Sequence, residues 1–222
     1  MRHRYLHASP FAHLALPKPE TRVLHPLAPE EWEQLLLACR SARKIDMLAE
    51  RATVRNRAIL WLLFDTGMRA SEVCELRLCD VDREHGTLLI RGKGARTRRL
   101  MLGHEGLRHL LIYVDTYHHG ATARVEQRDA SQDHLFLSET GHPLTKNGIS
   151  LLFGRLRRRS GITRSAVNPS LFRESFALRY LQTGGEPFIL QELLGYPDQT
   201  TSTRYQRLIA QGLAQQQCKG SL

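Results

Sequence analysis

One tyrosine near the end of the chain, Tyr205, stands in surroundings that could make it reactive. Three hydroxyl residues at 200–202 are candidate N-caps, so Tyr205 is expected in the first turns of a helix. Arg204 and Arg207 flank it. The positive end of a helix and nearby cations favour the phenolate, which is the nucleophilic form of tyrosine. The alternative is a half-exposed core tyrosine on a basic helix.

A second candidate is Arg69, in the stretch Thr66-Gly67-Met68-Arg69-Ala70-Ser71-Glu72. It follows a glycine that ends one helix and it begins the next, beside a helix that is apolar nearly all round. An arginine in such a place must be paired or must bind an anion. Glu72, one turn later, is a candidate partner. The alternative is a purely structural arginine–glutamate pair.

Two more cations lie in unusual settings. Lys93 stands between Gly92 and Gly94 at the expected tip of a hairpin, where it offers a movable point charge that can reach into a backbone groove. Arg173 lies near the start of an apolar helix. The alternatives are a solvated hairpin lysine and a solvated arginine in a first helical turn.

The composition favours a polyanionic partner. The 222 residues include 32 Lys and Arg against 22 Asp and Glu, which gives a formal net charge of +10. A surplus of this size is typical of nucleic-acid-binding proteins. The alternative is a soluble basic protein. The arginines also cluster, at Arg96, Arg98 and Arg99 and again at Arg155, Arg157, Arg158 and Arg159.

The cysteines and the apolar runs indicate the compartment. The four cysteines (Cys39, Cys74, Cys79 and Cys218) fit neither a disulfide framework nor a zinc pattern, so we expect a reducing compartment and no metal. No apolar run is long enough to span a membrane, and the N-terminus lacks a signal-peptide core. A cytoplasmic protein is the expectation.

These residues need a scaffold, and periodicity predicts a mainly α fold with a small antiparallel β-sheet, an α+β arrangement. Residues 1–25, with three prolines, indicate a linker or N-terminal extension. A loop is expected over Gly120–Asp133. The predicted helices begin at Pro29 and run over Thr53–Asp65, Ala70–Leu76, Leu107–Tyr117, Lys146–Ser160, Leu171–Gln182 and a segment ended by Gly195. The predicted strands are Thr87–Arg91, Arg98–Leu102 and a short edge strand, His134–Leu137.

Taken together, the ordered motifs resemble one family. TGMRASE, then GKG with Lys93 twenty-four residues after Arg69, then SLFRESFA, then LLGY with Tyr205 nine residues on, is similar to the catalytic domain of tyrosine recombinases of the phage-integrase type. The resemblance runs from about Leu27 to Leu208. It implies the tyrosine recombinase catalytic-domain fold over 26–210, with a C-terminal tail over 211–222.

The resemblance implies roles for the candidate residues. Arg69 and Arg173 match two arginines that clamp the non-bridging oxygens of a phosphate. Lys93 matches a general acid that protonates the 5′-oxygen. Tyr205 matches the nucleophile that forms a 3′-phosphotyrosyl link, which keeps the phosphodiester energy so that no cofactor is required. Glu72 matches a carboxylate that holds Arg69 in place.

The chain also departs from the family pattern at three positions. Ser170 stands where the family usually has a histidine, Tyr196 where it has histidine or tryptophan, and Glu174 where it often has histidine. A serine cannot act as an imidazole base at neutral pH. Because effects within one site do not add simply, we expect Ser170 and Tyr196 to reduce catalysis without abolishing it.

The expected function is a site-specific recombinase or integrase that cleaves and rejoins duplex DNA, with a cytoplasmic, nucleoid-associated location. Members of the family assemble as tetramers on DNA, so the resemblance implies a homotetramer on DNA and a monomer when free. The alternatives are a weakened or inactive DNA-binding accessory protein on the same fold and a type IB topoisomerase-like enzyme. The family's N-terminal DNA-binding domain is expected to lie outside this chain. The predicted DNA contacts are Arg91, Arg96, Arg98, Arg204 and Arg207.

Overall fold

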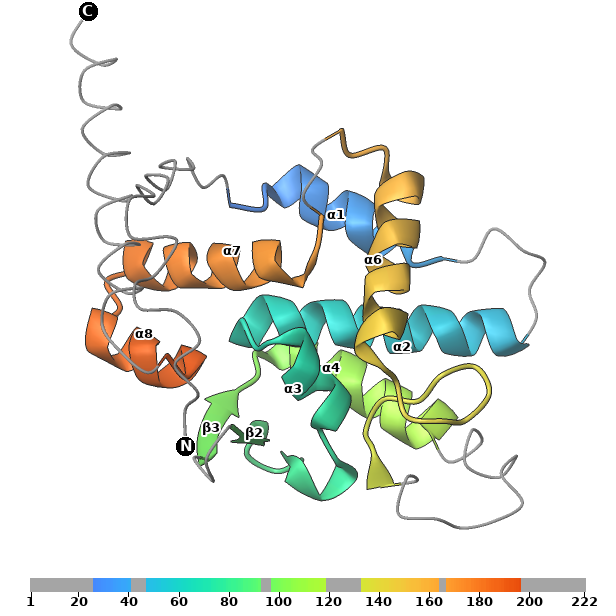
Figure 1. Ribbon diagram of the computed structural model, residues 1–222, viewed down its shortest axis with the longest axis horizontal. Helices are drawn as coiled ribbons and strands as arrows, with labels where there is room; N and C mark the ends of the chain where they lie inside the picture. The colour runs from blue at the N-terminus through green and yellow to red at the C-terminus, as the bar shows by residue number, and fades with distance from the viewer. Residues whose placement is uncertain (1–25, 41–46, 93–96, 119–132, 164–166, 197–222) are drawn as a thin grey trace, which may run out of the picture.

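Helices make up most of the fold, and one small sheet completes it. The computed structural model describes residues 26–40, 47–92, 97–118, 133–163 and 167–196. The predicted fold class, mainly helical with one small antiparallel sheet, is confirmed. Its elements (Figure 1) are α1 (Pro29–Ala38), α2 (Met47–Thr66), α3 (Ala70–Glu75), the 3-10 turn η1 (Leu78–Asp80), β1 (Val81–Asp82), β2 (Thr87–Arg91), β3 (Thr97–Met101), α4 (His104–Ile112), the π-helical η3 (Tyr113–His118), α6 (Lys146–Ser160), α7 (Pro169–Gln182) and α8 (Pro187–Leu194).

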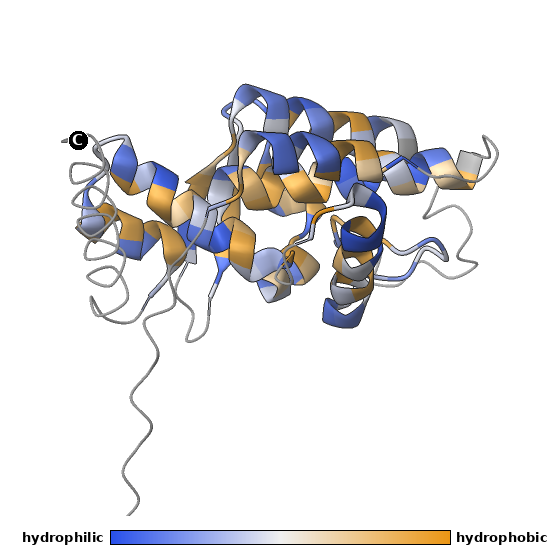
Figure 2. Cartoon of the chain, turned by 90° about the horizontal axis from the view of Figure 1, so that it is seen from above, coloured by the Kyte–Doolittle hydropathy of each residue, from blue (hydrophilic) through white to orange (hydrophobic). Residues whose placement is uncertain are grey.

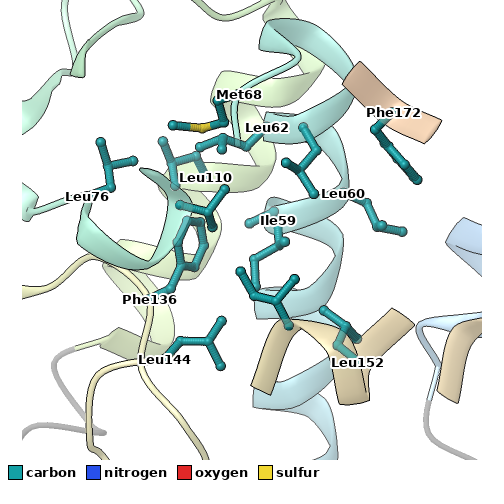
Figure 3. Close-up of a cluster of buried hydrophobic side chains, with 14 of the residues drawn as sticks. Ile59, Leu60, Leu62, Met68, Leu76, Leu110, Phe136, Leu144, Leu152 and Phe172 are labelled. Carbon is teal, nitrogen blue, oxygen red and sulfur yellow. The ribbon is translucent and has the colours of Figure 1, made fainter. Parts of the chain in front are cut away.

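The core is built around α2, which packs against α4 on one side and α7 on the other. Three of its side chains, Ile59, Leu60 and Leu62, are almost fully buried. Figure 3 shows Leu60 on the side of Phe172 of α7, and Leu62 on the side of Leu110 of α4. Figure 2 shows apolar residues gathered between the helices and polar residues on their outer faces. A helix that is apolar nearly all round, as predicted for this segment, therefore lies at the centre.

The sheet is a three-stranded antiparallel meander in the order β1-β2-β3. In its hairpin Leu88 pairs with Leu100 and Ile90 pairs with Arg98. The hairpin was predicted, with its second strand one residue out of place, whereas β1 was not, since two residues carry no period. The predicted edge strand at 134–137 is wrong, because this segment makes only isolated bridges, Arg77 with His134 and Leu137 with Pro143.

The helix limits differ from the predictions at several ends. Helix α2 begins at Met47 rather than at Thr53. The segment predicted as one helix over 107–117 begins earlier, at His104, and changes to a π-helical turn at Tyr113. Gly195 ends α8 in the left-handed conformation, with φ +62°, as predicted for a C-terminal cap.

A smaller apolar cluster attaches α8 to the rest of the fold. Ala177 and Leu178 of α7 pack with Leu190 and Leu194 of α8, and the partly buried Tyr196 joins them. Helix α8 also contacts β3, as Figure 1 shows. The end of α8 is therefore fixed between α7 and the hairpin. Among the described helices, none is both long enough and apolar enough to cross a membrane.

Candidate active site

Four segments that are distant in sequence meet at one end of the molecule. They are the turn after α2, the strand β3, the first half of α7 and the turn after α8. Each brings one side chain that matters below: Arg69, Arg98, Arg173 and Tyr196. Four of the contacts among them are hydrogen bonds to carbonyls at or near helix ends, so the geometry depends on where α2 and α8 stop.

Arg173 is the most enclosed of these residues, at 8% exposed. Its guanidinium donates from Nη1 to the Gly67 carbonyl at 2.9 Å and from Nη2 to the Leu194 carbonyl at 2.6 Å. Its Nε donates to the Tyr196 hydroxyl at 3.1 Å. Burial lowers the pKa of Arg173, and Tyr196 partly opposes that shift. Arg173 therefore joins the ends of α2 and α8 to α7, and it is not the solvated first-turn arginine of the alternative interpretation.

Arg69 is held more loosely. It precedes α3, and its backbone N–H donates to the Glu72 carboxylate at 2.8 Å. Its guanidinium donates to Glu72 at 3.3 Å and to the Gly195 carbonyl at 3.2 Å, while 40% of the side chain stays exposed. An arginine with spare N–H donors and access to solvent can receive an incoming anion.

Tyr196 lies against both arginines. The Arg173 guanidinium carbon is 4.5 Å from the centre of its ring and that of Arg69 is 5.7 Å away. Both distances are within the range of cation–π attraction. The ring thus brings the two cations to one place, and the phenol lies where the family usually has histidine or tryptophan.

Glu72 is buried, with 6% of its side chain exposed. Burial raises the pKa of its carboxyl, but the hydrogen bonds from Arg98 and from the Arg69 backbone, with the charges of both guanidinium groups, outweigh this and hold the pKa below its usual range. The carboxylate is therefore ionised at neutral pH and is shared between two arginines.

Arg98 was predicted as a DNA contact, and in the structure its side chain is engaged with Glu72 and α8. Its role as a DNA contact stays a prediction. Both of its terminal nitrogens donate to Glu72, at 2.9 and 2.8 Å, and its Nε donates to the Leu193 carbonyl at 2.7 Å. Only 13% of the side chain is exposed. The cause is strand alternation, because Arg98 shares the inward face of β3 with the buried Leu100. Arg98 faces Glu72 and does not extend toward solvent.

Arg91 lies on the same hairpin and remains accessible. Its guanidinium pairs with Asp80, at 2.7 Å from Nη1 and 2.6 Å from Nη2, while half of its side chain is exposed. Its role as a DNA contact stays a prediction.

Ser170 occupies the first turn of α7, where the Asn168 side chain caps the helix and Pro169 fits its start. It is exposed and lies one turn before Arg173. Five other candidates (Lys93, Arg96, Arg204, Tyr205 and Arg207) lie outside the described residues.

Sequence reasoning missed two features of this arrangement. It did not foresee that the carbonyls of Gly67 and Leu194 would receive Arg173, or that Arg98 would be the main ion partner of Glu72. The signal for Arg98 was present, since a charged residue two positions before Leu100 on an alternating strand points inward. In the described part of the chain, no group of three His, Cys, Asp or Glu side chains could hold a metal ion.

Comparison with known proteins shows the family of the chain. The sequence model of the Phage integrase family matches residues 26–211. Tyrosine recombinase XerC of Bacillus subtilis is 30% identical over 205 residues, which cover 92% of this chain and 64% of the relative. XerC of Anoxybacillus flavithermus is 31% identical, with 92% and 65% covered. The chain therefore spans slightly less than two thirds of these curated relatives.

Solved structures of recombinases have a similar fold. The XerH site-specific recombinase bound to palindromic difH substrate, in a post-cleavage complex, has a TM-score of 0.69 and 25% identity, over 87% of this chain and 52% of its own. XerA recombinase has a TM-score of 0.68 and 23% identity, over 88% and 66%. The likeness to XerA shows a shared fold.

Proposed function

The chain belongs to the phage integrase family of tyrosine recombinases, and on this basis we propose that it cleaves and rejoins duplex DNA through a 3′-phosphotyrosyl intermediate on Tyr205. The observation that carries the proposal is the meeting of Arg69 and Arg173 on the ring of Tyr196. Both guanidinium groups also donate to carbonyls at the C-terminal end of α8, Leu194 for Arg173 and Gly195 for Arg69.

In the proposed reaction, the Tyr205 phenol loses its proton to water, its oxygen attacks the scissile phosphorus and the bond from phosphorus to the 5′-oxygen breaks. Lys93 gives its proton to that oxygen, which leaves as a 5′-hydroxyl. A 5′-hydroxyl from the partner strand then attacks the phosphotyrosyl link and gives its proton to the neutral Lys93 amine. The phosphodiester is restored, and Tyr205 leaves and regains a proton from water. One bond to phosphorus is exchanged for another at each step, so the reaction needs no external energy source.

The arginines supply the electrostatic part of the mechanism. Negative charge builds on the non-bridging oxygens as phosphorus becomes five-coordinate, and fixed cations stabilise it. Arg173 is already fixed by its three hydrogen bonds, and Arg69 keeps N–H donors and solvent access. The Tyr196 hydroxyl accepts a hydrogen bond from Arg173 Nε and so orients the guanidinium plane.

The finer parts of the function are also proposals. By analogy with the XerH complex on difH, the partner is duplex DNA with a specific site. We propose a cytoplasmic enzyme that acts as a homotetramer on DNA. The net charge of +10 favours such a polyanionic partner.

The test is covalent trapping. Nicked suicide duplexes from the DNA that flanks the gene are incubated with the wild type, Tyr205→Phe and Tyr196→Phe, and separated on a denaturing gel. We expect a protein–DNA band in the wild type, none in Tyr205→Phe, and a weaker band in the matched control Tyr196→Phe, which keeps the ring. Binding without any covalent band in the wild type would instead favour the accessory-protein function.

A further inference from the structure

Arg98 makes the strongest set of ionic contacts at the site, although it is not one of the two candidate phosphate-binding arginines. It grips both oxygens of Glu72 in the parallel, two-bond geometry that suits a guanidinium and a carboxylate. Its third bond, to the Leu193 carbonyl, ties β3 to α8. Three elements, α3, β3 and α8, are therefore joined through one side chain.

Arg69 contacts the same carboxylate more weakly. Its guanidinium reaches a single oxygen of Glu72, at 3.3 Å, against 2.9 and 2.8 Å for Arg98. Its side chain is also three times as exposed as that of Arg98, at 40% against 13%. Arg98 is thus the main ionic partner of the buried Glu72 carboxylate. The positive charge of the Arg69 guanidinium is only weakly compensated by Glu72.

We propose that Arg98 is a positioning residue that prevents Glu72 from pairing fully with Arg69, and so keeps the Arg69 guanidinium available for a DNA phosphate. This inference rests on the function proposed above. It gives Glu72 and Arg98 opposing effects on Arg69, because the carboxylate attracts its guanidinium and Arg98 competes for the same oxygens.

The consequence of losing Arg98 follows from the burial of Glu72. A buried carboxylate without its main partner draws the nearest cation. In this structure that cation is Arg69, already in contact at 3.3 Å. Its guanidinium would turn onto Glu72 and would no longer face solvent. Removing the charge of Glu72 as well should release Arg69 again.

This reversal defines the experiment, a double-mutant cycle of Arg98→Met, Glu72→Gln and the double variant. Methionine keeps much of the arginine stem, and glutamine still accepts the Arg69 backbone N–H. The rate of covalent complex formation is measured in a single turnover, at a temperature well below the lowest thermal unfolding midpoint of the four proteins. We expect Arg98→Met to be slower by roughly 10²-fold, the effect of losing one electrostatic donor, and the double variant to recover about tenfold of that loss.

The second readout does not depend on cleavage. Duplex affinity is measured by fluorescence anisotropy between low and moderate salt, and the slope of log affinity against log salt is compared. A lost phosphate contact reduces this slope by about 0.9. We expect that reduction in Arg98→Met and a return to the wild-type slope in the double variant. Fold stability alone does not produce this pattern, because the slope does not depend on the fraction of folded protein.

The matched control is the second arginine–carboxylate pair on the same hairpin, Arg91 with Asp80. Asp80 is as deeply buried as Glu72, with 2% of its side chain exposed, but it has no contact with Arg69 among those of the described residues. Arg91→Met should reduce the salt slope if Arg91 contacts DNA directly, and Asp80→Asn should not restore it. Arg98→Lys, which keeps the charge without the paired geometry, should fall between wild type and Arg98→Met.

The outcomes separate the inference from the function on which it rests. A double variant as slow as Arg98→Met, or a slope that stays low in it, overturns the inference and returns Arg98 to a direct DNA contact. A slope that Arg98→Met does not change also overturns it. If the wild type forms no covalent complex, the proposed function fails, and the salt slopes alone decide the inference.

Discussion

Two regions of the site each present an arginine, but in opposite ways. Arg69 lies in the turn after α2, and Arg173 lies in the first half of α7. Arg173 is buried and donates to two main-chain carbonyls and a phenol. Arg69 is 40% exposed and makes two long hydrogen bonds from its guanidinium. The difference indicates that one arginine belongs to the fold as much as to the site, whereas the other is kept adjustable by its neighbours.

The largest effect is expected from Arg173→Met. The change leaves the Gly67 and Leu194 carbonyls and the Tyr196 hydroxyl without their donor. Because a hydrogen bond from a charged group contributes about 1.5–3 kcal/mol, we expect the free energy of unfolding to fall by at least about 3 kcal/mol, with loss of covalent complex formation. Urea denaturation and the trapping gel measure the two effects. An unchanged unfolding midpoint would show that Arg173 is no more structural than Arg69.

Arg69→Met is expected to separate chemistry from stability. Its side chain is well exposed, so its ion pair should contribute less than about 1 kcal/mol to folding, and Glu72 keeps Arg98 as its partner. Covalent complex formation should still slow by roughly 10²–10³-fold, because a donor to the phosphate is lost. The same two assays apply. A loss of stability as large as that in Arg173→Met would remove the contrast between the two regions.

Ser170→His tests the departure of α7 from the family pattern. A histidine in this first helical turn has its pKa lowered from about 6.5 by the helix N-terminus. The neutral imidazole is the base, so the rate should rise as pH increases through that pKa. We expect about a 10²-fold gain near neutral pH, at the low end of the effect of a positioned base. Rates across pH are compared with Ser170→Ala, which adds no base, and an identical profile would contradict the prediction.

The smallest effect concerns the pH dependence of stability through Glu72. Its pKa is lowered in the folded protein, so its contribution is complete above the ordinary value of about 4.3. The contribution is lost as pH falls below that value, toward the lowered pKa. The difference in unfolding free energy between wild type and Glu72→Gln should therefore shrink from pH 5 toward about pH 3. A difference that grows over this range would contradict the ion-pair description.

The half-buried Asp65 shows the opposite shift in pKa. Burial raises the pKa of its carboxyl, against the hydrogen bond from the Gly103 N–H and the charge of Arg179. For a raised carboxyl pKa the sign reverses, and acidification toward the raised pKa favours the folded state. Asp65→Asn should therefore remove a gain in stability on mild acidification, and Glu72→Gln should not.

Local patterns accounted for much of the fold. The apolar period of α2, the glycine that ends α8 and the alternation in the hairpin each act within a few residues, so the sequence predicted them. The two-residue strand β1 and the irregular segment at 134–137 have no such period. Their form depends on pairing with distant residues, as in the bridge of Arg77 to His134.

The residues of the candidate site were predictable, and so was the local pairing of Arg69 with Glu72, but the contacts between distant segments were not. The motifs identified Arg69, Arg173 and Tyr196, which the structure brings together. They did not show that Arg173 bonds to the carbonyl ends of two helices or that Arg98 turns inward. Such contacts join residues from 21 to 106 positions apart, so they depend on the packed arrangement of α2, α8 and β3.

The most direct test of the account locates the covalent bond itself. The complex trapped on a suicide duplex is digested with trypsin and a nuclease, and the peptide that retains a nucleotide is identified by mass spectrometry. Cleavage after Arg204 and Arg207 isolates Tyr205 in a three-residue peptide, whereas Tyr196 falls in the peptide 180–204. The account predicts the nucleotide on Tyr205. A nucleotide on Tyr196, which already lies against both arginines, would contradict it.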